Sequence, residues 1–191
     1  MNKKDLRVVK TQNILYRTLI ELMKEKTFEE IKVSDICNQA LINRSTFYAH
    51  YNDKYELLAQ FIQELKNSLT GELKKNKSIS NTKEYYLEMI RLFLDHIEEK
   101  RESYLAIMLH NRNSITMDII YDVLDRDITL HLQQDNFLER NQIPRGIIAK
   151  FYIGAVVNVG IEWLKNGNQY TKEDMLKYFN LLIPDELNHK V

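Results

Sequence analysis

Apolar residues recur at the spacing of an α-helix along almost the whole chain, and no segment shows the two-residue alternation of a β-strand. Near the N-terminus, mostly apolar pairs follow one another at four-residue steps: Ile14/Leu15, Thr18/Leu19 and Leu22/Met23. Only 5 Gly and 2 Pro occur in 191 residues, whereas turn-rich sandwiches, barrels and glycine-rich nucleotide loops need more of them. The sequence therefore predicts an all-α fold.

The limits of the helices follow from where this periodicity starts and stops. Asn43 stands where it can cap a short helix, and Asp53 with Glu56 forms an acidic capping box before a long one. The polar stretch 74–81 is the best candidate for a linker. About nine helices are expected, near residues 8–26, 34–39, 43–50, 53–73, 86–97, 103–111, 115–136, 144–166 and 171–183.

Charge and cysteine content narrow the class of protein. Lys+Arg 27 against Asp+Glu 27 gives a formal charge of +0, which excludes a generally basic coat for nucleic acid but not a local basic surface. The single cysteine, Cys37, cannot form an internal disulfide, and packing is the simplest role for it. No apolar leader is visible, and the most apolar run, 151–161, is shorter than the ~20 residues that cross a bilayer. We expect this run to form a helix buried on several sides. We expect a cytoplasmic protein with no membrane partner.

Residues 33–51 have the pattern of a helix-turn-helix. Ala40 is small enough for the point where two helices cross closely, and Ile36, Ile42 and Phe47 have the spacing needed to plug the corner between them. The second helix then presents short polar and basic groups at its N-terminal end, where a major groove would be read. A solvated helix start is the plainer interpretation of those groups, but the complete pattern favours DNA contact.

Individual roles can be assigned within this pattern. Arg44 can make a bidentate contact to guanine, and the Thr46 methyl can pack on thymine. Tyr48, His50, Tyr51 and Lys54 can bond phosphates, which fix position without reading sequence. On this basis Lys54→Ala is expected to lower the salt slope of DNA binding by about 1 per site. The full candidate DNA-binding set is Ser34, Asn43, Arg44, Ser45, Thr46, Tyr48, His50, Tyr51 and Lys54.

The segment resembles the TetR family of bacterial transcription regulators over about residues 8–58. The residues that carry the resemblance are Phe28-x-x-Ile31-x-Val33-x-x-Ile36, Asn43-Arg44-x-Thr46-Phe47-Tyr48-x-His50-Tyr51 and Lys54-x-x-Leu57-Leu58. Two departures are Lys32, where the family often has a capping Thr, and Leu41-Ile42-Asn43, which replaces a more usual Gly-Val-Ser turn. The resemblance implies a homodimer with a DNA-binding domain, residues 1–55, and a ligand-binding and dimerisation domain, residues 56–191.

Within the family, the C-terminal part is similar to the subgroup that regulates dihydroxyacetone kinase operons, although no ligand transfers with this similarity. The matching residues are Phe151-Tyr152-x-Gly154-Ala155-Val156 and Trp163-Leu164-x-x-Gly167. Some members of the subgroup resemble coactivators that work through a protein partner. The leading hypothesis is a ligand-responsive repressor that binds a palindromic operator, and the alternative is a transcriptional adaptor with weak DNA reading.

Two further sets of residues are candidates for the C-terminal part. Apolar residues on two helices predict a four-helix dimer seam, with Gly154 and Gly160 permitting close approach; they are Phe151, Ala155, Val159, Trp163, Met175, Phe179 and Leu182. Candidate effector contacts are Tyr86, Tyr104, His110 and Tyr121, for each of which ordinary packing is the simpler interpretation. No nucleophile–base pair, phosphate loop or metal-ligand spacing can be assembled. The sequence therefore predicts neither an enzyme nor a cofactor.

Overall fold

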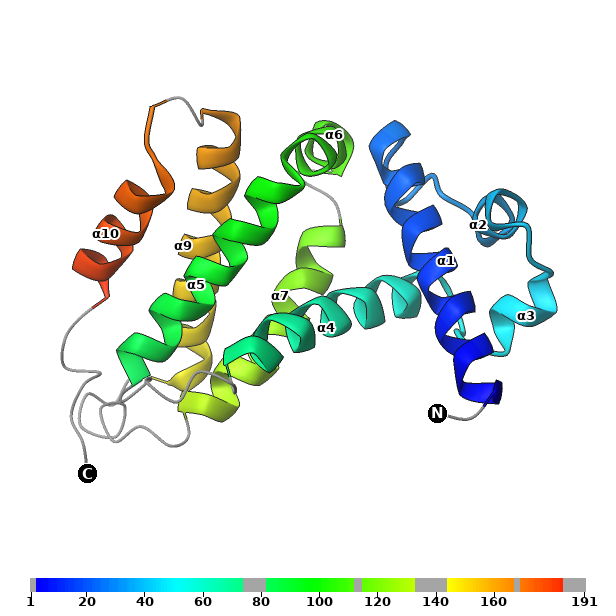
Figure 1. Cartoon of the computed structure of the whole chain (residues 1–191), viewed down its shortest axis with the longest axis horizontal. Coiled ribbons are helices and arrows are strands. Elements are labelled where there is room, and N and C mark those ends of the chain that lie inside the picture. The colour runs from blue at the N-terminus through cyan, green and yellow to red at the C-terminus, as the bar shows by residue number, and fades with distance from the viewer. Residues whose placement is uncertain (1–2, 74–81, 112–114, 133–143, 167–168, 184–191) are drawn as a thin grey trace. The chain divides into compact units, whose positions relative to one another are not determined.

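The chain is all-α in the part that the computed structural model describes, residues 3–73, 82–111, 115–132, 144–166 and 169–183 (Figure 1). Its helices are α1 Lys3–Glu25, α2 Val33–Ala40, α3 Arg44–Tyr48, α4 Lys54–Leu73, α5 Thr82–Glu99, α6 Arg101–Asn111, α7 Ile115–Leu132, α9 Arg145–Lys165 and α10 Lys172–Leu182. The predicted fold class is confirmed. The proposed linker 74–81, Gly167 and the end of the helix predicted to reach residue 136 lie outside the described residues.

Contacts between residues divide the chain into two compact units. Unit 1 comprises Met1–Glu64 and Glu102–Ile120, and unit 2 comprises Leu65–Arg101 and Tyr121–Val191. Helix α4 is therefore shared between them, and α6 belongs with the N-terminal helices. The division of roles between residues 1–55 and 56–191 stays a prediction, since compactness does not assign a function.

The core of unit 1 fixes the geometry of the helix-turn-helix. Helix α1 packs against α2, and α2 packs against α3. The corner is filled by Ile36 and Phe47, which are both fully buried, while Ile42 is half-buried. Burying an aromatic or branched side chain of this size contributes roughly 1.5–3 kcal/mol. The apolar plug predicted from the sequence is thus present.

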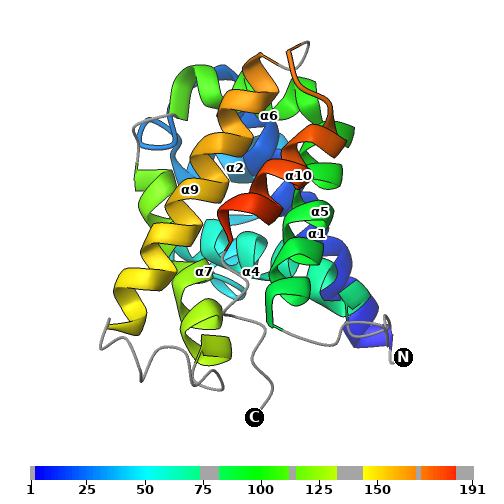
Figure 2. The same ribbon diagram turned by 90° about the vertical axis from the view of Figure 1, so that its left-hand side faces the viewer.

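In unit 2, helices α5, α9 and α10 lie side by side (Figures 1 and 2). Each of the three contributes buried apolar residues, among them Leu94, Ile153 and Phe179. The Lys172 ammonium lies 2.6 Å from Asp95 Oδ1, which adds a polar link between α10 and α5. This unit therefore has a hydrophobic core of its own.

Helix α9 differs from the sequence expectation. Its segment Gly146–Lys165 is long and apolar enough to cross a membrane by length and composition alone, yet only 33% of that window is buried in the single chain. The sequence predicted a helix buried on several sides. Instead one face packs on α5, and the opposite face leaves Ile147 and Phe151 exposed.

Candidate nucleic-acid interface

The turn between α2 and α3 is tight. Leu41, directly after α2, takes a left-handed conformation with φ 56, and its N–H donates to Asn38 O at 3.3 Å. The Ile42 N–H then donates to Cys37 O at 3.0 Å. These two bonds satisfy the last carbonyls of α2 and redirect the chain into α3. The Leu41 side chain is 91% exposed, so the turn gains no packing from it.

Helix α3 has one buried and one exposed side. Phe47 points into the core, whereas Arg44, Ser45 and Tyr48 are exposed and Thr46 is half-buried. Asn43 occupies the N-cap position with extended backbone, but its side chain makes no capping bond and remains exposed. Arg44, Ser45 and Tyr48, three of the residues predicted to contact DNA, thus lie on an accessible surface. Their contacts with DNA stay a prediction.

The N-terminus of α2 is held by Asp35. Lys32 has no acceptor with which to cap the helix, so Asp35 Oδ2 accepts from the Lys32 N–H at 3.1 Å and from Lys26 Nζ at 2.8 Å. The hydrogen bond from Lys26 and that from the Lys32 backbone hold the Asp35 pKa below its usual range. Ser34, the other polar residue of this turn, is half-buried.

The phosphate contact predicted for Tyr51 is wrong. The residue is 1% exposed, and its ring centroid lies 5.8 Å from that of Phe47 and 6.3 Å from that of Tyr16. Burial raises the pKa of its hydroxyl. Tyr51 is a core residue because its ring packs beside Tyr16 of α1 and Phe47 of α3. Its half-buried neighbour His50 remains a candidate.

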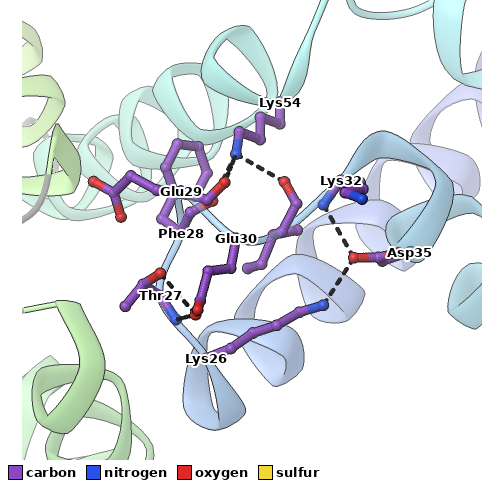
Figure 3. Close-up of polar contacts among 9 residues, drawn as sticks. Lys26, Thr27, Phe28, Glu29, Glu30, Lys32, Asp35 and Lys54 are labelled. Atoms are coloured by element: carbon purple, nitrogen blue, oxygen red, sulfur yellow. Dashed lines mark hydrogen bonds and ion pairs between the residues drawn. The ribbon is translucent and has the colours of Figure 1, made fainter.

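Lys54 also differs from expectation. Its ammonium donates to three backbone carbonyls of the connection between α1 and α2, those of Phe28 at 2.7 Å, Glu29 at 2.9 Å and Ile31 at 2.7 Å (Figure 3). It also lies 4.8 Å from the centroid of the Phe28 ring. Burial lowers its pKa. An ammonium has three donors, so a phosphate contact would have to displace one of these bonds.

The capping box predicted for α4 is present in altered form. Asp53 Oδ1 accepts from the Glu56 N–H at 2.8 Å, as expected. The return bond, however, reaches one residue further back, because Glu56 Oε2 accepts from the Asn52 N–H at 2.7 Å. Both contacts fix the start of α4 next to the helix-turn-helix.

Asn111 was missed by sequence reasoning. It is the last residue of α6, it is 1% exposed, and its side chain contacts backbone groups more than 80 residues earlier in the chain. Nothing local distinguishes it, because an Asn at a helix end is ordinarily a solvated cap. Nearby, the Ile115 N–H donates to Glu29 Oε1 at 3.0 Å.

The candidate effector residues are divided between the two units. Tyr104 and His110 belong to unit 1, and Tyr86 and Tyr121 belong to unit 2. Burial raises the pKa of Tyr104, whereas His110 is exposed. The Tyr121 hydroxyl accepts from Asn158 Nδ2 at 3.2 Å. An effector role for these four side chains stays a prediction.

The predicted dimer seam is partly wrong. Phe151, Val159 and Leu182 are exposed and Ala155 is half-buried, but Trp163, Met175 and Phe179 are buried inside unit 2. The reason lies in the helical repeat: at about 100° per residue, Trp163 lies about 120° around α9 from Phe151. Its indole N–H donates to Tyr170 O at 2.9 Å.

The two glycines of α9 that were predicted to permit close approach, Gly154 and Gly160, also differ in their surroundings. A Cβ added at Gly160 would lie 3.0 Å from the Phe93 ring of α5, so Gly160 serves packing within the chain. A Cβ added at Gly154 would meet nothing within 4 Å. Of these two, Gly154 alone remains available for close approach to a second copy.

Cys37 is buried, and desolvation raises the pKa of its thiol, as packing predicts. Among the described residues no three His, Cys, Asp or Glu side chains gather in a way that could hold a metal ion.

A helix-turn-helix with an exposed polar reading helix, carried on a larger all-α chain, defines a DNA-binding transcriptional regulator. Residues 15–61 match the family described as "Bacterial regulatory proteins, tetR family", and residues 84–185, more than half of the chain, match "Transcriptional regulator C-terminal region". The chain belongs to the TetR family of transcriptional regulators.

Individual relatives agree with this assignment. The chain is 25% identical over 166 residues, 85% of its length and 83% of the relative's, to the HTH-type dhaKLM operon transcriptional activator DhaS of Lactococcus lactis. It is 42% identical over 60 residues to the uncharacterised HTH-type regulator YxbF of Bacillus subtilis, of which the match spans only 16%. A TetR transcriptional regulator from Streptococcus agalactiae has a similar structure, with 25% identity, a TM-score of 0.63 and coverage of 94% and 96% of the two chains.

Proposed function

We propose that the chain is a ligand-responsive repressor that binds a palindromic operator as a homodimer in the cytoplasm. The observation that carries this proposal is the exposed face of α3, where Arg44, Ser45 and Tyr48 are accessible while Phe47 anchors the helix in the core. A short recognition helix held rigidly in this way can place side chains against base edges in a major groove. No catalytic activity is proposed.

A second copy of the chain supplies the other half of the reading surface. Large apolar side chains that are exposed on α9 and α10 support this part of the proposal, because apolar side chains of this kind are buried when a second copy covers them. They are Ile147, Phe151, Val159, Leu181 and Leu182. A two-fold dimer presents two recognition helices, which must lie about 34–36 Å apart to enter successive major grooves.

Regulation is proposed to act through α4. The helix begins beside the helix-turn-helix at Lys54 and continues to Leu73, passing from unit 1 to unit 2 after Glu64. A small-molecule effector that binds one orientation of α4 better than another changes the spacing of the two recognition helices. The effector can shift this equilibrium only by its differential affinity for the two states. Tyr86, Tyr104, His110 and Tyr121 remain the candidate contacts.

A second candidate function is activation of transcription through a protein partner. The similarity to the activator DhaS over most of both chains favours it. The two functions differ in what the isolated chain does: a repressor binds its operator tightly alone, whereas an adaptor reads DNA weakly.

The test is to select duplexes from a random pool with the purified chain and to measure the Kd of the enriched duplexes over a salt series. Tight, salt-sensitive binding to a palindromic site supports the proposed function. Arg44→Ala should cost about 1–3 kcal/mol and blur the preference at one base position. Failure of the wild-type chain to enrich any sequence would favour the adaptor.

A further inference from the structure

The connection between α1 and α2 receives side chains from two distant parts of the sequence. Lys54 approaches it from α4, and Asn111 approaches it from the end of α6. Phe28 is held by both: its carbonyl accepts from Lys54 Nζ at 2.7 Å, and its N–H donates to Asn111 Oδ1 at 2.7 Å. The peptide groups on both sides of one fully buried residue are thus fixed from two different helices.

Both the oxygen and the nitrogen of the Asn111 side-chain amide make hydrogen bonds. Its Nδ2 group donates to Met23 O at 3.0 Å, to Ile107 O at 3.1 Å and, at 3.5 Å, to Lys26 O. The opposite amide orientation would set N–H groups against the Phe28 N–H and an oxygen against carbonyls, so the network itself selects this one. The contact satisfies carbonyls at the C-terminal end of α1 that the helix leaves without a partner.

A buried amide specifies a position more sharply than an apolar contact. Apolar surfaces can slide over each other at little cost, but a buried polar group that shifts out of register loses its partners and keeps its desolvation penalty. The Asn111 contact is therefore either made or broken. We propose that Asn111 is a positioning residue for DNA recognition, which ties α6 to the base of the helix-turn-helix and makes operator affinity depend on that tie.

This inference rests on the proposed DNA binding and names a point of its regulation. Any ligand or substitution that moves the end of α6 must either carry the α1–α2 connection with it or break the amide contacts. Coupling of this kind is reciprocal, so DNA that selects one arrangement of the helix-turn-helix must also stabilise the Asn111 contact.

The test uses the full chain with the substitution Asn111→Asp. The carboxylate keeps the shape of the side chain and the acceptor for the Phe28 N–H, but it turns an oxygen toward carbonyls that now receive an N–H. At neutral pH and at a temperature where circular dichroism shows a folded variant, the Kd for a wild-type-selected duplex should rise about fivefold or more. The salt slope should stay at the wild-type value, because no phosphate contact is lost.

A pH series separates positioning from general damage. A carboxyl surrounded by carbonyls has a raised pKa and regains a donor when protonated, so the ratio of variant Kd to wild-type Kd should fall as the pH is lowered. The control is Leu109→Ala, a change in the same turn of α6 at a residue that is 82% exposed; it should leave binding unchanged. Wild-type affinity of the folded Asn111→Asp variant at every pH would overturn the inference.

If Asn111→Asp does not fold, a hydrogen-exchange measurement on the wild-type chain still tests the inference. Hydrogen exchange at the Phe28 N–H should slow when the selected duplex is added, and by a larger factor than at the Ile183 N–H directly after α10. Equal or absent slowing would overturn the inference. A wild-type chain that selects no duplex would instead overturn the proposed function on which it rests.

Discussion

At the scale of single residues, two basic side chains near the recognition helix have different environments. Arg44 is exposed at the start of α3, where a guanidinium can reach a base edge. Lys54, ten positions later, has its ammonium turned inward onto three carbonyls. Sequence position suggested the same partner, DNA, for both. Hydrogen bonding distinguishes them, because Lys54 donates to backbone carbonyls of the α1–α2 connection whereas Arg44 stays exposed.

We therefore expect Lys54→Met to act on stability. The variant keeps the apolar stem but removes the ammonium from the carbonyls of Phe28, Glu29 and Ile31, of which the Phe28 carbonyl keeps its bond from the Ile31 N–H. This loss should lower the free energy of unfolding by about 2 kcal/mol. The salt slope of DNA binding should not change. Urea denaturation and a salt series measure the two effects, with Lys24→Met in α1 as the control. An unchanged stability with a slope lower by about 1 per site would restore the phosphate role.

Asp35 should give the helix-turn-helix a dependence on acid. Its folded pKa is lowered, chiefly by the hydrogen bond from Lys26, so its contribution is present above the unfolded value of 3.8 and is lost as the pH falls through the folded value. Asp35→Asn should lower stability by about 0.2–1 kcal/mol at pH 7. The difference from wild type should vanish at low pH. A difference that stays constant down to pH 2 would show that the charge is not responsible.

At the scale of elements, the turn between α2 and α3 holds the only non-glycine residue with positive φ among those described. The left-handed conformation has a steric cost for Leu41, and its exposed side chain makes no packing contact that would offset this cost. Leu41→Gly should therefore raise the free energy of unfolding by about 1 kcal/mol. Leu41→Ala keeps the strain and should change little. A destabilised glycine variant would mean that the leucine side chain has a partner in the folded protein.

The order and approximate limits of the helices were predictable because each amphipathic segment carries its own period. Local capping was predictable only in part, since the Glu56 carboxylate accepts from the Asn52 N–H rather than from the Asp53 N–H. The burial of Tyr51 and the Asn111 contact were not predictable, because both depend on which distant helix lies opposite. The dimer seam failed at Trp163 because four-residue steps drift around a helix of 3.6 residues per turn.

At the scale of the whole molecule, the proposed dimer connects DNA binding with assembly through the exposed face of α9. Phe151 is 70% exposed and lies on the same side as Gly154, where a partner backbone can approach closely. The core side of the same helix is occupied by α5, so this face is available to a second copy. Burial of such a surface stabilises an interface by roughly 25 cal/mol per Å² of apolar area, and a charge introduced into it would have to be desolvated.

Phe151→Asp should therefore convert the chain to a monomer at micromolar concentration without loss of helix content. A monomer carries one recognition helix and cannot bind two half-sites at once, so its affinity for a palindromic duplex should fall toward that for a single half-site. Sedimentation and titration on full and half-site duplexes measure both effects. Leu109→Asp, which adds the same charge at an exposed leucine of α6, is the control and should remain a dimer. A Phe151→Asp variant that sediments as a dimer would place the interface elsewhere, and a wild-type chain that is monomeric would remove the dimer from the proposed mechanism.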